Sequence, residues 1–297
     1  MTADPPSLDD LRSEIDEIDI AVHDLLMRRV ALADQIGHVK GDGGPYIRPG
    51  REARILRRLV ARHTGPLPKT VLVSIWREII SAMTALEGPY AVAVFAGGTD
   101  HDELPALARL HYGAERPISA HESILGVLRA VSDGHATVGV LPLPQGDEAD
   151  PWWRNLVRNG PDVPKIIARL PFAVLNRRFE GLEALVVALA PPEASDHDRS
   201  FLVAVNSGQL SRGAFREALT RAGFQVVDMQ NWSAGGKIPW VLVEVEGFVE
   251  KTDPRLQHLA EQENSPVGQV WVIGSYAVPL SVEELAPDCG PEQRGCP

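Results

Sequence analysis

The amino-acid sequence predicts a multidomain protein in which an all-α unit is followed by an α/β lobe and by a smaller α+β unit. Three observations predict this class. Over the first 88 residues, apolar residues recur in steps of three and four, the period of amphipathic helices. From residue 90, short apolar runs typical of buried strands alternate with helical stretches. From about residue 200, the order β-α-β-β-α-β is that of a ferredoxin-like module.

Composition excludes several classes of protein. The chain has 297 residues, of which 44% are apolar and 23% charged, so it should fold into domains with sizeable cores. A net charge of −11 argues against nucleic acid and anionic membranes as partners. Residues 1–88 are nearly balanced, with 12 basic and 13 acidic residues, whereas the remainder has 17 and 27. An anionic ligand is therefore most readily accommodated in the first third.

The two ends of the chain carry few signals. The start, MTADPPSLDD, has no basic and apolar leader pattern, and no run is long enough to span a bilayer, so we expect a cytoplasmic protein. Cys289 and Cys296 lie in a Gly/Pro-rich tail that we expect to be disordered, with reduced thiols. The histidines and cysteines show no spacing typical of a metal site, and we expect neither a metal nor a cofactor.

Three helices are expected in the all-α unit. The first should span residues 7–40, with Ser7 as its N-cap, and should end at the glycine-rich segment 41–45. The second should span residues 51–63. The third should span residues 69–87 and end at Gly88 and Pro89.

The first helix has a basic residue inside its apolar seam. Position 29, an arginine, falls within the series Leu8, Leu11, Ile15, Ile18, Val22, Leu25, Leu32, Ile36 and Val39. Arg29 is therefore either a costly structural oddity or an anion ligand. Lys40 lies ~16 Å further along the axis, close to three whole turns away, so both side chains share a face and bracket a small ligand. Arg12 lies roughly 25 Å from Arg29, so if Arg12 also serves a site, the simplest is the site of a partner subunit whose helix packs antiparallel.

Four motifs carry a resemblance to a known family. They are L-R-x-x-I-D-x-I-D and R-R-x-x-L-A-x-x-I-G-x-x-K in the first helix, R-E-A-R-I-L in the second, and W-R-E-I-I-S-A in the third. Over residues 8–87 the chain resembles the helical chorismate mutases. Members of that family are intertwined dimers whose long first helix spans both active sites. The resemblance implies the same all-α dimer, a homodimer through the first helix, for this chain.

The resemblance also implies a reaction and a set of residues. The family rearranges chorismate to prephenate, an intramolecular reaction that needs no nucleophile and no cofactor. Arg29, Arg51 and Arg12 of the partner subunit would bind the two carboxylates. Lys40 would donate a hydrogen bond to the ether oxygen, and Glu52 would orient the ring hydroxyl.

Three positions depart from the common pattern of the family. Arg48 stands where an acidic residue often precedes the R-E pair, and we expect it to contribute to substrate binding. Met83 replaces a small polar residue. Glu87 stands where a glutamine often donates a second hydrogen bond to the ether oxygen, so as a catalytic residue it would have to be protonated, which burial would favour.

The remainder resembles a prephenate dehydratase followed by an ACT-type regulatory module. The resemblance rests on Gly97-Gly98-Thr99, on the segment ESILGVLRAVSDGHATVGVLP at 122–142, and on EVEGF and VIGSY near the end. The dehydratase motif Thr-Arg-Phe reads here Arg199-Ser200-Phe201, and the polar stretch expected after Pro142 is missing. Residues 90–200 have room for only one lobe of this two-lobed enzyme. We therefore expect this half to be catalytically silent.

The expected domains are a mutase domain, a shortened dehydratase-like α/β domain, an ACT-like domain and a tail, at residues 1–88, 89–199, 200–282 and 283–297. Two alternatives stay open. The protein is bifunctional, with mutase and dehydratase activity, or it is a regulatory binding protein in which the helical part only dimerises an amino-acid-sensing half. Chorismate and an aromatic amino acid effector are the expected small-molecule partners.

Overall fold

The structure is a computed structural model of the 297-residue chain. It describes residues 6–40, 46–98, 103–146, 148–158, 160–175, 177–233, 239–260 and 267–287. The side chains of Lys40, Arg177 and Ala260 are outside the described part. Cys289 and Cys296, with the predictions made for them, also lie outside it.

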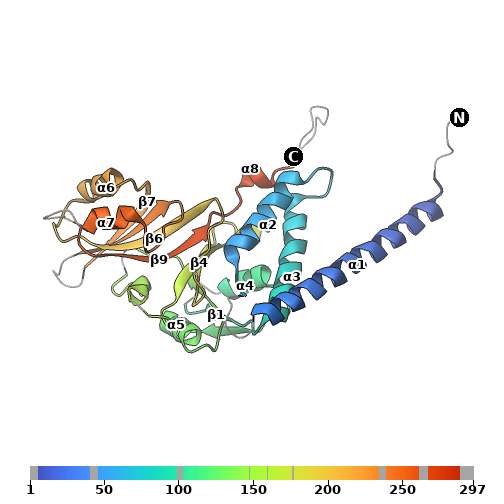
Figure 1. Ribbon diagram of the computed structural model, residues 1–297, viewed down its shortest axis with the longest axis horizontal. Helices are drawn as coiled ribbons and strands as arrows, with labels where there is room; N and C mark the ends of the chain where they lie inside the picture. Colours follow the sequence, from blue (N-terminus) through green and yellow to red (C-terminus); the bar gives the residue numbers. More distant parts are fainter. Residues whose placement is uncertain are drawn as a thin grey trace.

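The three predicted helices of the first unit are confirmed. They are α1 (Leu8–Lys40), α2 (Pro49–Arg62) and α3 (Lys69–Glu87). Ser7 caps α1, because its Oγ accepts a hydrogen bond of 3.2 Å from the backbone N–H of Asp10. Helix α1 leaves the body of the protein as a long arm, and only its C-terminal part lies beside α3 (Figure 1).

A single mixed sheet runs through the rest of the chain. Its strand order is β2-β1-β3-β5-β4-β9-β6-β8-β7. Strands β2 and β3 are parallel to β1, and β5 is antiparallel to β3 and β4. The strands are β1 (Val92–Phe95), β2 (Ile118–His121), β3 (Val138–Pro142), β4 (Lys165–Leu170), β5 (Ala184–Ala188), β6 (Asp198–Val205), β7 (Val226–Trp232), β8 (Trp240–Glu246) and β9 (Val270–Ala277).

Two helices cover opposite faces of the first five strands. Helix α4 (Leu104–Tyr112) packs on the face of Val92 and Val94, whereas α5 (Ile124–Ser132) packs on the face of Ala93. This alternation along β1 is the period of two that places successive side chains on opposite faces of a strand. Both faces of β1 are therefore buried, as the continuous apolar run predicts.

The predicted β-α-β-β-α-β order of the last unit is confirmed. Helices α6 (Arg212–Arg221) and α7 (Pro254–Ala260) cover one face of β6 to β9 (Figure 1). Their side chains Phe215 and Leu219 share a buried cluster with residues of β6, β8 and β9. The described residues of this part thus form a ferredoxin-like α+β arrangement.

The two sheets predicted from the sequence are joined into one. Strand β4 pairs in parallel with β9 at a single position, Ile166 opposite Gly274. A buried cluster crosses this junction, since it contains residues of α5 and β5 together with Phe201 and Tyr276. The division of the chain into separate domains at residues 89 and 200 remains a prediction.

Two local elements differ from the sequence-based expectation, strand β2, which no clear apolar run predicts, and helix α8 (Val282–Leu285). Two 3-10 turns also occur, η3 (Trp152–Leu156) and η4 (Arg177–Phe179). The tail expected to be disordered from residue 283 begins inside helix α8. This helix forms because Ser281 and Glu284 make a reciprocal capping box, and because Arg57 holds Glu284 at 2.8 Å.

The helical unit is packed on the sheet body. Ala53, Leu56 and Val60 of α2 share a buried cluster with Phe172 and Ala277 of the body. No helix among the described residues is long and apolar enough to cross a membrane.

Candidate active site

Arg29 lies where α1 passes the ends of the other two helices. Its side chain is half-buried, and its Nη1 atom is shielded from solvent without any hydrogen-bond partner among the described residues. Burial and the nearby cation of Arg51 lower the pKa of Arg29 from its ordinary value, and the carboxylate of Glu87 partly opposes this. A buried donor without an acceptor is costly, at ~1–3 kcal/mol, so it is rarely found unless a ligand satisfies it.

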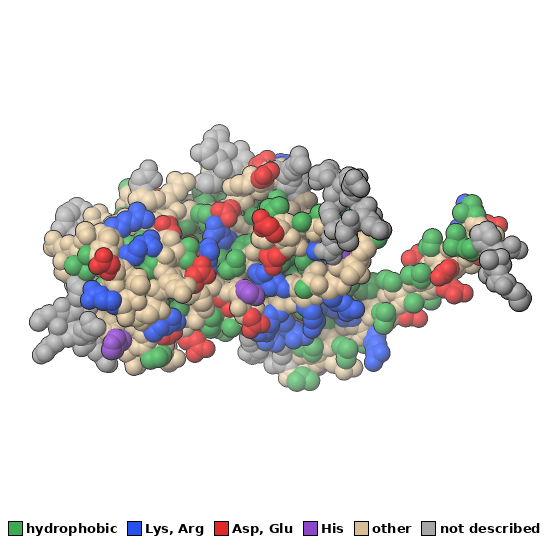
Figure 2. Space-filling view, turned by 90° about the horizontal axis from the view of Figure 1, so that it is seen from above, with side chains coloured by type: hydrophobic (Ala, Val, Ile, Leu, Met, Phe, Trp, Pro, Cys, Tyr) green, Lys and Arg blue, Asp and Glu red, His purple; other side chains and the backbone are tan. Residues whose placement is uncertain are grey.

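Arg51 and Glu87 lie within electrostatic reach of Arg29, from the first turn of α2 and the last turn of α3. Gly37 of α1 lies against the Glu87 backbone, where a Cβ atom would be 3.5 Å from the Glu87 Cα. Basic side chains gather on the surface where α1 leaves the body (Figure 2). The structure therefore brings together three residues of the predicted site, Arg29, Arg51 and Glu87.

Arg12 is not part of this group within one chain. It lies on the projecting arm, where its exposed guanidinium contacts only Asp9 in the described part of the chain, at 3.3 Å. This agrees with the helical geometry, which places Arg12 and Arg29 too far apart for one small ligand. The side chain of Lys40, the predicted donor to the ether oxygen, lies outside the described residues.

Glu52 faces the interior of the protein. Arg77 of α3 donates a hydrogen bond of 3.1 Å to the Glu52 carboxylate, and its guanidinium lies 5.1 Å from the ring centroid of Phe172. Burial raises the pKa of Glu52, while Arg77 opposes the shift, and burial also lowers the pKa of Arg77. The predicted contact of Glu52 with a substrate hydroxyl remains a prediction.

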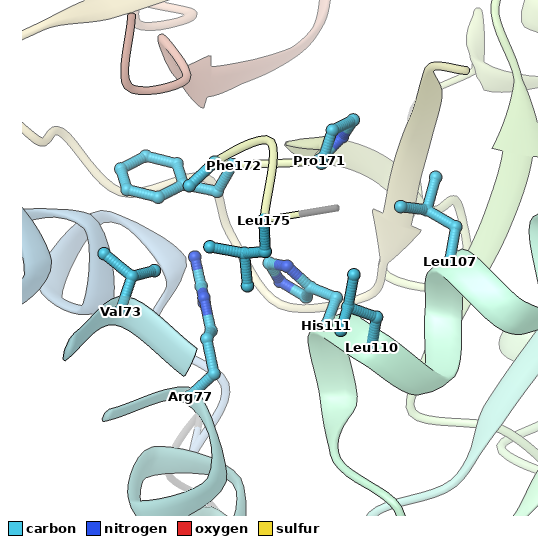
Figure 3. Close-up of a pocket in the computed structure, with 9 residues that line it drawn as sticks. Val73, Arg77, Leu107, Leu110, His111, Pro171, Phe172 and Leu175 are labelled. Carbon is cyan, nitrogen blue, oxygen red and sulfur yellow. The ribbon is translucent and has the colours of Figure 1, made fainter. Parts of the chain in front are cut away.

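The cavities beside this ion pair are small. Figure 3 shows Arg77 rising from α3 toward Phe172, with His111 of α4 beside it. Burial and the Arg77 cation hold the pKa of His111 well below its usual range. Among the described residues, Arg77 borders cavities with volumes of about 10 and 20 Å³. Since a single water needs roughly 10–15 Å³, neither admits a substrate.

Arg48 is held by a residue that the sequence analysis did not consider. Glu193, in the segment between β5 and β6, accepts a hydrogen bond of 2.9 Å from Arg48 Nε and another from Nη2. Its second oxygen accepts the backbone N–H of Arg51, also at 2.9 Å. No periodic pattern marks Glu193, and the only signal available was the unusual base at position 48.

The arm exposes its apolar seam. Leu8, Ile15, Leu25 and Val39 have 62%, 57%, 64% and 88% of their surface exposed. On α3, Ile75 and Leu86 are also exposed. A contiguous apolar stripe of this length on a soluble chain typically marks a protein interface.

The polar groups of the residues that match the dehydratase motif already make hydrogen bonds and ion pairs within the protein. Ser200 is fully buried, where its hydroxyl donates to the carbonyl of Gly247, shares a hydrogen bond with Ser275 and accepts the N–H of Val249. Arg199 pairs with Glu246 at 3.0 Å. Neither side chain is available to a substrate without breaking these bonds.

Comparison with known proteins concerns the helical unit first. Residues 11–88 match the family model described as chorismate mutase type II. The bifunctional chorismate mutase/prephenate dehydratase of Pseudomonas aeruginosa is 31% identical over 152 residues, which cover 49% of this chain and 41% of the relative. The matched stretch is longer than residues 11–88, so it also includes part of the sheet body. The chain spans about two fifths of the length of this relative.

Two solved structures align with part of the chain at low similarity. One, titled as a novel type of quorum quenching acylase, GqqA, has 15% identity and a TM-score of 0.45, and covers 66% of this chain and 98% of its own. The other, the prephenate dehydratase from Streptococcus mutans, has 14% identity and a TM-score of 0.45, and covers 64% of this chain and 100% of its own. From the family model and the bifunctional relatives, residues 11–88 are a chorismate mutase type II domain, followed by a prephenate dehydratase-like region.

Proposed function

We propose that the protein is a chorismate mutase, which rearranges chorismate to prephenate in the synthesis of aromatic amino acids. The observation that carries the proposal is the shielded Nη1 atom of Arg29, which has no acceptor among the described residues and lies near a second arginine, Arg51. Two guanidinium groups that repel each other at the meeting point of three helices suit a ligand with two carboxylates.

The rearrangement requires a compact conformer rather than a reactive side chain. Arg29 and Arg51 bind the carboxylates and hold the substrate with its ends close together, which removes most of the entropic barrier. Negative charge grows on the ether oxygen in the transition state, and Lys40 is the proposed donor there. Glu87 lies beside Arg29, in position to contact the same oxygen when it is protonated.

The proposal includes a homodimer in which α1 is shared. The exposed seam of α1 supports it, because an apolar face of this length is covered in a stable protein. An antiparallel partner arm would place Arg12 of the partner subunit beside Arg29, and so complete the site.

The proposal treats the sheet body as catalytically silent. Its support is the structural use of Ser200 and Arg199, whose polar groups are already bonded. Among the described residues, the α/β part has one five-stranded lobe, so a cleft between two lobes is missing there. An aromatic amino acid bound to the ferredoxin-like part is the proposed effector.

One assay separates this proposal from its alternatives. Purified protein is given chorismate and then prephenate, while loss of chorismate and formation of phenylpyruvate are followed. We expect prephenate to accumulate without phenylpyruvate. Phenylpyruvate would show that the protein is bifunctional, and unchanged chorismate would favour the regulatory binding protein. Calorimetry with phenylalanine and tyrosine tests the effector.

Mixed dimers test whether the site is shared. Arg12→Ala and Arg29→Ala chains are each expected to be nearly inactive alone. When they are unfolded together and refolded, about half of the dimers contain both chains, and each of these regains one intact site, because one subunit supplies Arg29 and the other Arg12. Activity should return to roughly a quarter of the wild-type value. Monomers, or no recovery at all, would contradict the shared site.

A further inference from the structure

Helix α2 begins without a cap of its own. Position 48, which precedes its first turn, makes no side-chain hydrogen bond to the helix N-terminus. The first backbone N–H groups of a helix lack intrahelical acceptors and need partners from elsewhere. Here the Glu193 carboxylate, 142 residues away in the chain, accepts the N–H of Arg51. The carboxylate that accepts the Arg51 N–H therefore comes from the dehydratase-like region, whereas Glu52 in the same turn pairs with Arg77.

Glu193 belongs to a short segment that crosses the start of α2. We name residues 193–195 the strap. The carbonyl of Ala194 accepts a hydrogen bond of 3.2 Å from Arg54 Nη1. The strap passes so close to α2 that a Cβ atom on Gly50 would lie 2.4 Å from the Glu193 carbonyl oxygen and 2.8 Å from that of Ala194. Only glycine fits at position 50 while the strap stays in place.

The strap is fixed to the sheet body. Ser195 is buried, with its hydroxyl donating to Asp198 Oδ1 at 2.6 Å and its backbone N–H donating to Asp198 Oδ2 at 2.8 Å. Asp198 is the first residue of β6. Glu193, whose carboxylate holds α2, thus lies a few residues before a rigid strand. This attachment gives Glu193 the support that a positioning residue needs.

We infer that Glu193 is a positioning residue for the mutase site, which the dehydratase-like region supplies to orient Arg51 and to neutralise Arg48. The inference rests on the proposed function. Glu193 binds Arg48 through one oxygen and the Arg51 backbone through the other, so it sets the first turn of α2, from which the Arg51 side chain reaches the substrate. It also holds the Arg48 guanidinium, which the sequence analysis assigned to substrate binding, in an ion pair with the strap instead.

The chemistry explains the departure at position 48. An acid at that position would cap α2 from within the helical unit, as N-terminal acids do through the helix dipole. With Arg48 at that position, a carboxylate from outside the helical unit is needed to neutralise the Arg48 charge and to accept the Arg51 N–H. Glu193 meets both needs with one carboxylate.

The test compares Glu193→Ala and Glu193→Gln with Glu284→Gln. The control breaks another ion pair between α2 and the body, Arg57 with Glu284, further along the helix. In the Glu193 variants, KM for chorismate should rise about tenfold, with kcat changed less than about threefold. The reason is that a misoriented Arg51 binds the substrate carboxylate less well in the ground state and in the transition state alike. The control should keep KM within about twofold.

A double-mutant cycle with Arg48→Ala separates the two actions. If Glu193 acts mainly on Arg48, the KM effect of Glu193→Ala should largely vanish in the Arg48→Ala background. If it acts mainly on the Arg51 backbone, the effect should persist there. Equal KM values in wild type and both Glu193 variants would overturn the inference.

Amide exchange distinguishes failure of the inference from failure of the proposed function. The Arg51 amide proton should exchange faster in Glu193→Ala than in wild type and in Glu284→Gln, whether or not the protein turns over chorismate. Glu193→Gln should show a smaller increase, because its amide oxygen still accepts a hydrogen bond. An inactive wild type would overturn the proposed function alone. Unchanged exchange of the Arg51 amide would overturn the inference that Glu193 orients the first turn of α2. Since Glu193→Gln keeps the side-chain volume, it serves if the alanine variant does not fold.

Discussion

Replacing Arg29 with methionine is expected to abolish most chorismate turnover while leaving the protein at least as stable as wild type. Loss of a half-buried charge partner typically costs about 2–5 kcal/mol of ligand interaction, so kcat/KM should fall at least about thirtyfold. The free energy of unfolding, in contrast, should stay equal or increase. Methionine completes the apolar seam and removes a buried donor that has no acceptor in the described part of the chain.

Two measurements check this prediction. Steady-state kinetics on chorismate gives the loss of kcat/KM, and thermal unfolding followed by circular dichroism gives the melting temperature, which we expect to stay equal or to rise by a few degrees, on the order of 2–4 °C per kcal/mol. The matched control is Arg28→Met, at the exposed neighbouring position, for which we expect neither change. A lower melting temperature for Arg29→Met would show that Arg29 stabilises the fold and would contradict its role as a ligand.

Replacing Gly274 with alanine is expected to be the most destabilising single change in the sheet. Gly274 has a φ of 151°, and a Cβ atom there would lie 2.2 Å from the carbonyl oxygen and 2.4 Å from the nitrogen of Ile166. Both contacts are with backbone, which cannot rotate away. The position is also the one where β4 pairs with β9, so the strands must separate to make room. We expect a loss of at least about 3–4 kcal/mol in the free energy of unfolding.

The control is Gly134→Ala. Gly134 has a φ of 74° and open space around its Cβ position, so only the backbone strain of a left-handed alanine is expected, about 1–2 kcal/mol. Urea unfolding of both variants gives the comparison. If the two substitutions cost the same, the strand junction contributes nothing beyond backbone conformation, and the two halves of the sheet are held by side-chain packing alone.

The long helical elements could be predicted because their signals are local. The seam of α1 and the Gly/Pro segments that end α1, α2 and α3 depend on spacings of a few residues. Strand β2 escaped prediction because it is four residues long and only half-buried, so it shows no clear apolar run. Helix α8 did carry a signal, since Ser281 and Glu284 have the spacing of a capping box.

The residues of the candidate site also differ in whether a local sequence signal marks them. Arg29 could be singled out because it interrupts an apolar seam, and Arg51 and Glu87 followed from motifs within the helical unit. Glu193 could not be found, because its bond to Arg48 spans 145 residues and its own segment has no periodicity. The junction of β4 with β9 also joins residues far apart in sequence, Ile166 and Gly274, and no local pattern near Gly274 predicts its partner.

The bond between Arg48 and Glu193 has a consequence for the order in which the protein matures on the ribosome. The helical unit is synthesised first, yet the acceptor for the start of its second helix follows 145 residues later. At ~5–20 residues per second, that interval is roughly 7–30 s. During this time the nascent mutase unit carries an unneutralised Arg48 and an uncapped α2. The helical unit that emerges first is therefore among the last parts to reach its finished geometry.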